Sequence, residues 1–189
     1  MTQSGHWFSD GKTRCVLKME TFFGSVSMDW LSIAQIVALT TIANGTPVLA
    51  QRLFGKLGSQ PLDNGLQWFD SRPLFGHSKT IRGVFVAVLM TSAASPLLGL
   101  HWTVGLVAAL AAMGGDLVSS FVKRRLGLAT SSRATGLDQV PESLLPALAC
   151  ASSLNLTLLD VIAATTIFFV GEIALSKVLY KMRIRARPF

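Results

Sequence analysis

The residues best suited to chemistry lie between Gly114 and Arg125, at the end of an apolar run. If this segment is helical, positions i, i+3, i+4 and i+7 place an anion, two hydroxyls and a cation on one face: Asp116, Ser119, Ser120 and Lys123. A carboxylate costs about 2.5–3.5 kcal/mol at the centre of a membrane helix and less near the interface, so it usually has a function. The pattern is typical of a site for a metal ion and a phosphate.

A second carboxylate, Asp138, lies just before Pro141, where the chain returns to an apolar run. If the small, polar segment 129–136 folds back, Asp138 would face Asp116. Two carboxylates suit Mg²⁺, which takes hard oxygen ligands and keeps substrate phosphate in its shell. Asp138 alone is equally typical of a helix cap, and the basic cluster Lys123 to Arg125 alone is typical of a topology signal.

A third feature is the segment Gly76-His77-Ser78-Lys79-Thr80, which runs into an apolar stretch. A flexible turn, a cation, a hydroxyl and free amides at a helix N-terminus are the components of an anion site. The segment lacks the first glycine of a P-loop and no strand precedes it. It therefore predicts a phosphate contact and argues against a kinase-type P-loop.

The composition indicates the environment of these residues. Of 189 residues, 50% are hydrophobic and only 14% are charged, whereas soluble domains carry about 25% charged residues. The formal charge of +7 does not indicate nucleic acid, because the basic residues end apolar runs and no aromatic residues interleave them. Anionic lipid headgroups or a polyphosphate fit better. Cys15 and Cys150 predict neither a disulfide nor a zinc site.

Apolar runs of about 17–25 residues predict an all-α, polytopic integral membrane protein with about five transmembrane helices. The expected spans are 29–50, 81–100, 102–122, 141–158 and 159–180. Trp30 and Trp102 stand at run ends, where interfacial anchors occur. Only a polar patch around Asn155 separates the last two spans, which predicts a tight hairpin.

Lysines and arginines follow the first, third and fifth spans, and the connections around His101 and Asn155 contain none. The positive-inside rule therefore predicts two long cytoplasmic loops, a cytoplasmic C-terminus and an external N-terminus, in the cell (inner) membrane. Residues 1–28 are expected to be a flexible leader, with Met28 as an alternative start, and 29–189 the membrane-embedded domain.

Several blocks, in order, resemble the integral-membrane cytidylyltransferases, and within them the CDP-archaeol synthase branch of the CDP-diacylglycerol synthase superfamily. The matching segments are Asn44-Gly45-Thr46-Pro47, Asp63-Asn64-Gly65, residues 70–83, residues 115–125 and Leu137-Asp138-Gln139. Two departures stand out. The His-Gly-Gly stretch of the bacterial-type enzymes is missing before Asp138, which favours the archaeol-like branch, and Asp70-Ser71-Arg72 replaces the frequent Asp-Gly-Arg.

The resemblance implies an enzyme that transfers CMP from CTP to a membrane lipid phosphate of the archaetidic- or phosphatidic-acid type and releases pyrophosphate. It implies Mg²⁺ held by Asp116 and Asp138, which with Lys123 and Arg124 form the catalytic group. It implies that the remaining residues of the matching blocks bind substrate: Asn44, Asp63, Asp70, Arg72, Gly76, Lys79, Thr80, Arg82, Ser119, Ser120, Arg125 and Gln139. Read without the resemblance, Asn44-Gly45-Thr46-Pro47 is equally typical of a packing kink that breaks the first span.

The alternative from another class is a non-enzymatic membrane carrier or permease for an anionic solute. It would use the same basic residues at the ends of the spans. Paired Asp116 and Asp138 argue against it, because a carrier of anions gains nothing from carboxylates there. The expected partners are CTP, the lipid phosphate and the bilayer, with no nucleic acid and with a homodimer left open. Glu172, deep in the last run, is expected to pair or to function, without an assigned role.

Overall fold

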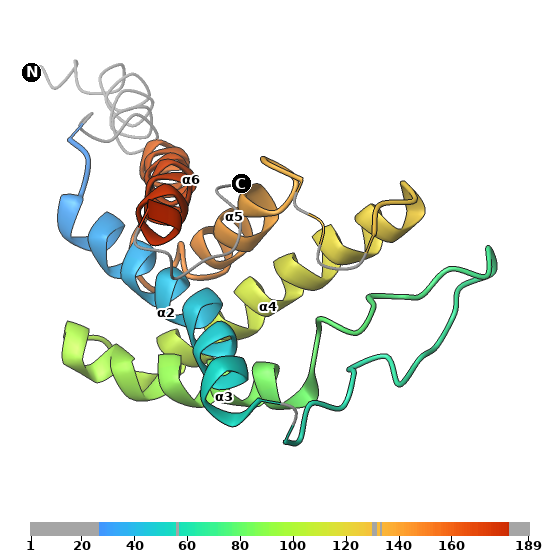
Figure 1. The fold of residues 1–189 in the computed structure, drawn as a ribbon. Coiled ribbons are helices and arrows are strands. Elements are labelled where there is room, and N and C mark those ends of the chain that lie inside the picture. The colour runs from blue at the N-terminus through green and yellow to red at the C-terminus, as the bar shows by residue number, and fades with distance from the viewer. Residues whose placement is uncertain (1–26, 56, 130–131, 133, 182–189) are drawn as a thin grey trace, which may run out of the picture.

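The computed structural model describes residues 27–55, 57–129, 132 and 134–181. These residues form helices and no strand (Figure 1): α2 (Trp30–Phe54), α3 (Ile81–Ala94), the short 3-10 helix η1 (Ser95–Leu98), α4 (Trp102–Arg125), α5 (Gln139–Ala149) and α6 (Leu158–Lys181). The all-α prediction is confirmed. The predicted leader, residues 1–28, lies almost entirely outside the described residues.

Four segments of the described chain are long and apolar enough to cross a membrane: Trp30–Phe54, Ile81–Leu98, Trp102–Arg125 and Leu158–Ser176. The fourth predicted span differs. Helix α5 has 11 residues and is about 16 Å long, against a hydrocarbon core of about 30 Å. It ends before Cys150 because a polar turn follows, in which Asn155 adopts a left-handed φ of 51°.

The chain nevertheless makes its fourth passage along the bundle. The N-terminus of α5 lies at what we call the loop end, where Lys123 of α4 pairs with Asp138. After the turn at 150–157, Asp160 accepts a hydrogen bond from the amide of Asp29 (3.2 Å), which caps the start of α2. The start of α2 marks the far end, so α5 and the turn together carry the chain from one end to the other.

Small residues let the helices approach closely around α4, which packs against α2, α3 and α5. An alanine cluster between α2, α3 and α4 is fully buried: Ala43, Ala87, Ala109 and Ala112. A Cβ on Gly105 would lie 2.8 Å from the Ser95 Cβ and 2.9 Å from the Ser92 Cα, so only glycine fits where α3 and η1 cross α4.

Helix α2 runs without interruption through Pro47, although the sequence predicts a break there. Proline removes one backbone donor, the one that would bond the carbonyl of Ala43 four residues earlier. The Thr46 hydroxyl donates to that same carbonyl at 3.5 Å. The Thr46 hydroxyl therefore partly satisfies the carbonyl that Pro47 leaves without an amide donor, and the helix continues past the proline.

The first loop, residues 55–80, folds back on itself as a two-armed projection beside the end of α4 (Figure 1). Antiparallel bridges join Pro61 with Thr80 and Gln67 with Pro73. The turn at its tip contains Ser71 with a left-handed φ of 59°, a conformation that favours glycine. Ser71 therefore adopts the backbone conformation that a glycine in an Asp-Gly-Arg turn would adopt without strain.

Candidate active site

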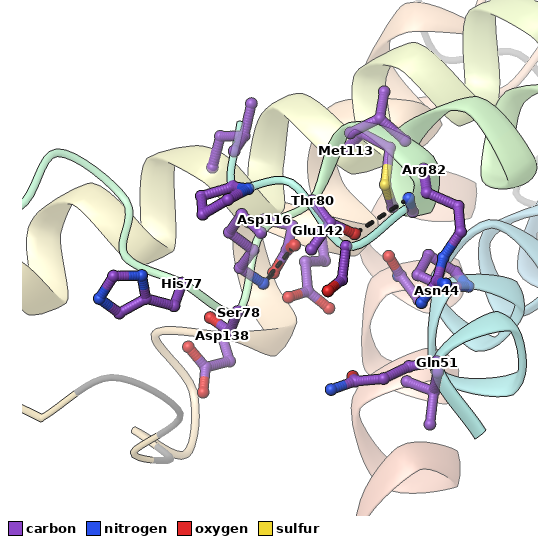
Figure 2. Close-up of a pocket in the computed structure, with 18 of the residues that line it drawn as sticks. Asn44, Gln51, His77, Ser78, Thr80, Arg82, Met113, Asp116, Asp138 and Glu142 are labelled. Atoms are coloured by element: carbon purple, nitrogen blue, oxygen red, sulfur yellow. Dashed lines mark hydrogen bonds and ion pairs between the residues drawn. The ribbon is translucent and has the colours of Figure 1, made fainter. Parts of the chain in front are cut away.

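A cavity of about 740 Å³ opens at the loop end, where five helices and both long loops contribute side chains (Figure 2). Its polar and charged lining comes from elements distant in sequence: Asn44 and Gln51 of α2; Ser59, His77, Ser78, Lys79 and Thr80 of the first loop; Arg82 of α3; Asp116 and Lys123 of α4; Ser132 and Asp138 of the second loop; Gln139 and Glu142 of α5; and Glu172 of α6. Eight of these are sequence-predicted site residues: Asn44, Lys79, Thr80, Arg82, Asp116, Lys123, Asp138 and Gln139.

Two lysine–aspartate pairs organise the cavity. The Lys79 ammonium binds both carboxylate oxygens of Asp116, which joins the first loop to α4. The Lys123 ammonium lies 2.7 Å from the Asp138 carboxylate, which joins α4 to the second loop. The fold therefore brings the two predicted acids to one cavity, each with a cation beside it.

Glu142 is a third acid in this cavity, and none of the sequence motifs contains it. It is half-buried and lines the cavity, and its carboxyl is close enough to the Asp116 carboxyl for the two to interact electrostatically. Figure 2 shows both side chains in the same pocket. The spacing could have revealed it, because Glu142 follows Asp138 by four residues and so shares its helical face. Glu172 of α6 also lines the cavity, although no motif covers it.

Asp63 lies outside the cavity lining and orders the loop that delivers Lys79. Its carboxylate is 4% exposed and accepts backbone hydrogen bonds from Gly65 (3.2 Å), Phe75 (2.9 Å) and Gly76 (2.9 Å). Burial acts to raise the pKa of Asp63, but the three amides stabilise the carboxylate more and hold the pKa below 3.8. Gly76, which the sequence predicts as a site residue, contributes through the hydrogen bond from its amide to Asp63.

Asp63→Ala is expected to loosen the first loop, because the amides of Gly65, Phe75 and Gly76 lose their acceptor. For the buried Gly76 amide the loss costs about 1–3 kcal/mol. Hydrogen exchange at residues 65–76 should quicken. In the wild type, folding lowers the pKa of Asp63, so its carboxylate contributes stability to the folded state. That stability is fully present above about pH 4–5 and is lost as pH falls below 3.8. Exchange that is unchanged in Asp63→Ala would contradict this role.

Thr80 and Arg82 fix the junction between the first loop and α3. The Thr80 hydroxyl caps α3 by accepting from the Gly83 amide at 3.1 Å. The Arg82 guanidinium donates to the carbonyls of Gly55 (3.0 Å) and Leu57. A cation there satisfies carbonyls at the end of α2 and complements its dipole.

The other eight predicted residues lie outside the cavity lining: Asp63, Asp70, Arg72, Gly76, Ser119, Ser120, Arg124 and Arg125. Ser119 and Ser120 are buried, and the Ser119 hydroxyl donates to the carbonyl of Asp116 in its own helix at 3.0 Å. The Arg124 guanidinium donates to the carbonyls of Leu128 (2.6 Å) and Ala129 (2.9 Å), at the start of the second loop.

Asp70, Arg72 and Arg125 join the first loop to the end of α4. The Arg125 guanidinium pairs with Asp70 and donates to the carbonyl of Pro73 at 2.7 Å. Arg72 donates in return to the carbonyl of Arg125 at 2.6 Å. In this structure these cations hold backbone in place, next to the cavity and outside its lining.

The bundle and its charged cavity define an integral membrane protein with a polar site at one membrane face. The CarS-like family, described as CDP-archaeol synthase, matches residues 35–189. The CDP-archaeol synthase of Sulfurisphaera tokodaii is 36% identical over 154 residues, 78% of this chain and 89% of the relative. That of Pyrobaculum arsenaticum is 33% identical over 153 residues, 78% of this chain and 92% of the relative.

A solved structure described as an intramembrane enzyme for archaeal membrane lipid biosynthesis matches with a TM-score of 0.65 and 33% identity. The match covers 75% of this chain and 90% of that one. The chain therefore belongs to the CarS-like CDP-archaeol synthase family. This membership confirms the resemblance drawn from the sequence blocks.

Proposed function

We propose that the loop-end cavity transfers the CMP group of CTP to the phosphate of an archaetidic-type membrane lipid. An oxygen of the lipid phosphate forms a bond to the α-phosphorus of CTP, the bond from that phosphorus to the bridging β-oxygen breaks, and pyrophosphate leaves. The products are pyrophosphate and a CDP-activated lipid. Membership of a family of CTP-using enzymes supports the reaction and leaves the alternative, an anion carrier, without support.

The observation that carries the proposal is the convergence of Lys79, Asp116, Lys123 and Asp138 from two loops and one helix. The reaction brings two polyanions together, so fixed cations must offset their repulsion and stabilise oxygens on which charge develops. Lys79 and Lys123 supply ammonium groups for this purpose. The lipid phosphate is already ionised near pH 7, because the second pKa of a phosphate monoester is about 6, so no general base is required.

The residues present fit Mg²⁺. The described residues contain no group of three or more His, Cys, Asp or Glu placed to hold an ion by themselves. Mg²⁺ commonly uses one or two carboxylates together with substrate phosphates and water. Asp116 and Asp138 remain the proposed ligands, and Glu142 lies beside Asp116 without completing a set of three. Bound Mg²⁺ would supply charge neutralisation on the triphosphate.

The sidedness of the protein is also proposed. The lysine and arginine clusters at the loop end favour a cytoplasmic location for the cavity and both long loops in the cell membrane. CTP would enter from the cytoplasm, and the lipid phosphate from the adjoining leaflet. The lipid-facing surfaces of the spanning helices carry exposed leucine, valine and phenylalanine side chains, as this arrangement requires.

Purified protein in detergent, incubated with CTP labelled in the α-phosphate and with Mg²⁺, is expected to form a labelled CDP-lipid. The panel should contain archaetidic-type and phosphatidic acids, with GTP and ATP as nucleotide controls. We expect the archaetidic-type acid and CTP to give the highest kcat/KM, and EDTA to stop turnover until Mg²⁺ is restored. Transport of an anion without CDP-lipid would overturn the proposed reaction, and full activity in EDTA would overturn the metal.

A further inference from the structure

The tip of the first loop exposes large apolar side chains on a segment rich in polar residues. Leu66 is 64% exposed, Trp68 is 45% exposed and Phe69 is 96% exposed. A cluster of solvent-exposed apolar side chains usually marks a surface that binds another protein, a ligand or a membrane. None of the three lines the cavity described above.

The tip is fastened to the last turns of α4. The Trp68 ring meets the Phe121 ring edge-to-face, with centroids 5.5 Å apart and an interplanar angle of 87°. The Arg125 guanidinium lies over the Phe121 ring, 5.0 Å from its centroid. Because Arg72 also donates to the carbonyl of Arg125, the position of the tip along α4 is set by several independent contacts.

The position of the Trp68–Phe121 contact relative to the bilayer follows from the length of α4. The helix begins at Trp102 at the far end, where the indole is 52% exposed, as in an interfacial anchor. From Trp102 to Phe121 a helix rises about 28 Å, at about 1.5 Å per residue, which is close to the hydrocarbon thickness of about 30 Å. A helix whose Trp102 lies at one membrane interface would thus bring Phe121 to the opposite interface, and the basic cluster that follows it to headgroup level.

The lipid-facing surface of α4 continues into the tip. Leu110 is 53% exposed, and Phe121 lies 11 residues, or about three turns, further along the same face. Val118, 51% exposed, lies beside that face. The exposed tip side chains extend this apolar surface sideways from the helix, at the depth where aromatic belts occur.

We propose that Leu66, Trp68 and Phe69 enter the headgroup boundary of the loop-end leaflet and anchor the first loop to the bilayer. The partner is the lipid bilayer itself. The anchor holds a loop whose base carries Asp63 and Lys79, so it would help to keep Lys79 in the cavity. This inference depends on the membrane embedding of the helices and not on the reaction proposed above.

The test uses fluorescence of the full-length protein in lipid nanodiscs. Phe69→Cys and Ser78→Cys, each in a Cys15→Ser background, are labelled with the environment-sensitive dye NBD; Cys150 is 1% exposed and stays unlabelled. Ser78 is the matched control, because it is an exposed residue of the same loop that lines the polar cavity and lies away from the apolar tip. The dye at position 69 should emit further to the blue and be quenched about twofold or more by lipids brominated near the headgroup.

The dye at position 78 should instead be quenched by aqueous iodide, because this residue lines the polar cavity. Equal iodide quenching at both positions, with no effect of brominated lipid, would show that the tip lies in water and would overturn the proposal. Shielding of position 69 from both quenchers would overturn it in favour of a protein contact, including one with a second copy of this chain. Catalytic activity enters none of these readouts, so failure of the proposed reaction would be seen separately.

Discussion

Asp116→Asn is expected to lower kcat by at least about 100-fold while the protein remains folded in detergent, comparable to the loss of one transition-state contact in other enzymes. The substitution removes the charge that would bind Mg²⁺ and the partner of the Lys79 ammonium. Both side chains are about one-fifth exposed, so water in the cavity can solvate the lysine that remains. The melting temperature should therefore change little. The measurement is turnover of labelled CTP at saturating lipid phosphate.

Asp160→Asn is the matched control. Asp160 is also a helical aspartate, 1% exposed, but at the far end, where it accepts from the amide (2.9 Å) and hydroxyl (2.8 Å) of Thr157. Its replacement should cost about 1–3 kcal/mol of stability and leave kcat unchanged. Wild-type turnover in Asp116→Asn, or equal losses of activity in both variants, would remove Asp116 from the proposed chemistry.

Gly115→Ala is expected to lower both stability and activity, because α4 and α5 touch at this residue. A Cβ on Gly115 would lie 2.5 Å from the carbonyl carbon of Pro141 and 2.8 Å from the amide nitrogen of Glu142, and closer still to the Pro141 oxygen. Backbone atoms cannot rotate away, so α5 must move. Overpacking of this kind costs about 1–3 kcal/mol, which should lower the melting temperature by several degrees. The shift would also move Glu142 relative to Asp116.

Gly114→Ala is the matched control for this prediction. Apart from its chain neighbours and the nearby backbone of α4 itself, no atom lies within 4 Å of a Cβ built on Gly114, so the added methyl meets no obstacle. Alanine favours a helix over glycine by about 0.8–1.0 kcal/mol, and stability should be equal or slightly higher. Adjacent glycines are thus expected to respond with opposite signs in a thermal-unfolding assay. A loss of stability in Gly114→Ala equal to that in Gly115→Ala would contradict the proposed contact between α4 and α5.

The residues of α4 show which cavity-lining residues the sequence pattern could predict. Helical spacing placed Asp116, Ser119, Ser120 and Lys123 on one face, yet only the first and last of these line the cavity. The Ser119 hydroxyl bonds its own helix instead, as serine in a helix often does. Arg124 and Arg125, adjacent to Lys123 in sequence, turn toward loop carbonyls. Spacing predicts which residues share a helix face, but it does not predict whether the cavity, another helix or a loop lies against that face.

The apolar runs by themselves determined the membrane class, the all-helical fold and the positions of four long helices, because about 20 consecutive apolar residues are needed to cross a bilayer as a helix. The ordered blocks between Asn44 and Gln139 were sufficient to identify the family, since residues that bind the same groups recur at similar spacings. The fourth span was predicted too long, because the polar turn at 150–157 shortens the helix without returning the chain to the loop end.

Only the tertiary structure decided that Glu142 lies beside Asp116, that each aspartate has its own lysine, and that the first loop rests on Phe121. These contacts join positions between 15 and 53 residues apart in sequence. Their geometry depends on the rotation of each helix about its axis and on how closely the backbones approach, which Gly115 permits. A local sequence pattern sets the phase of one helix, whereas the cavity results from the packing of several helices against one another.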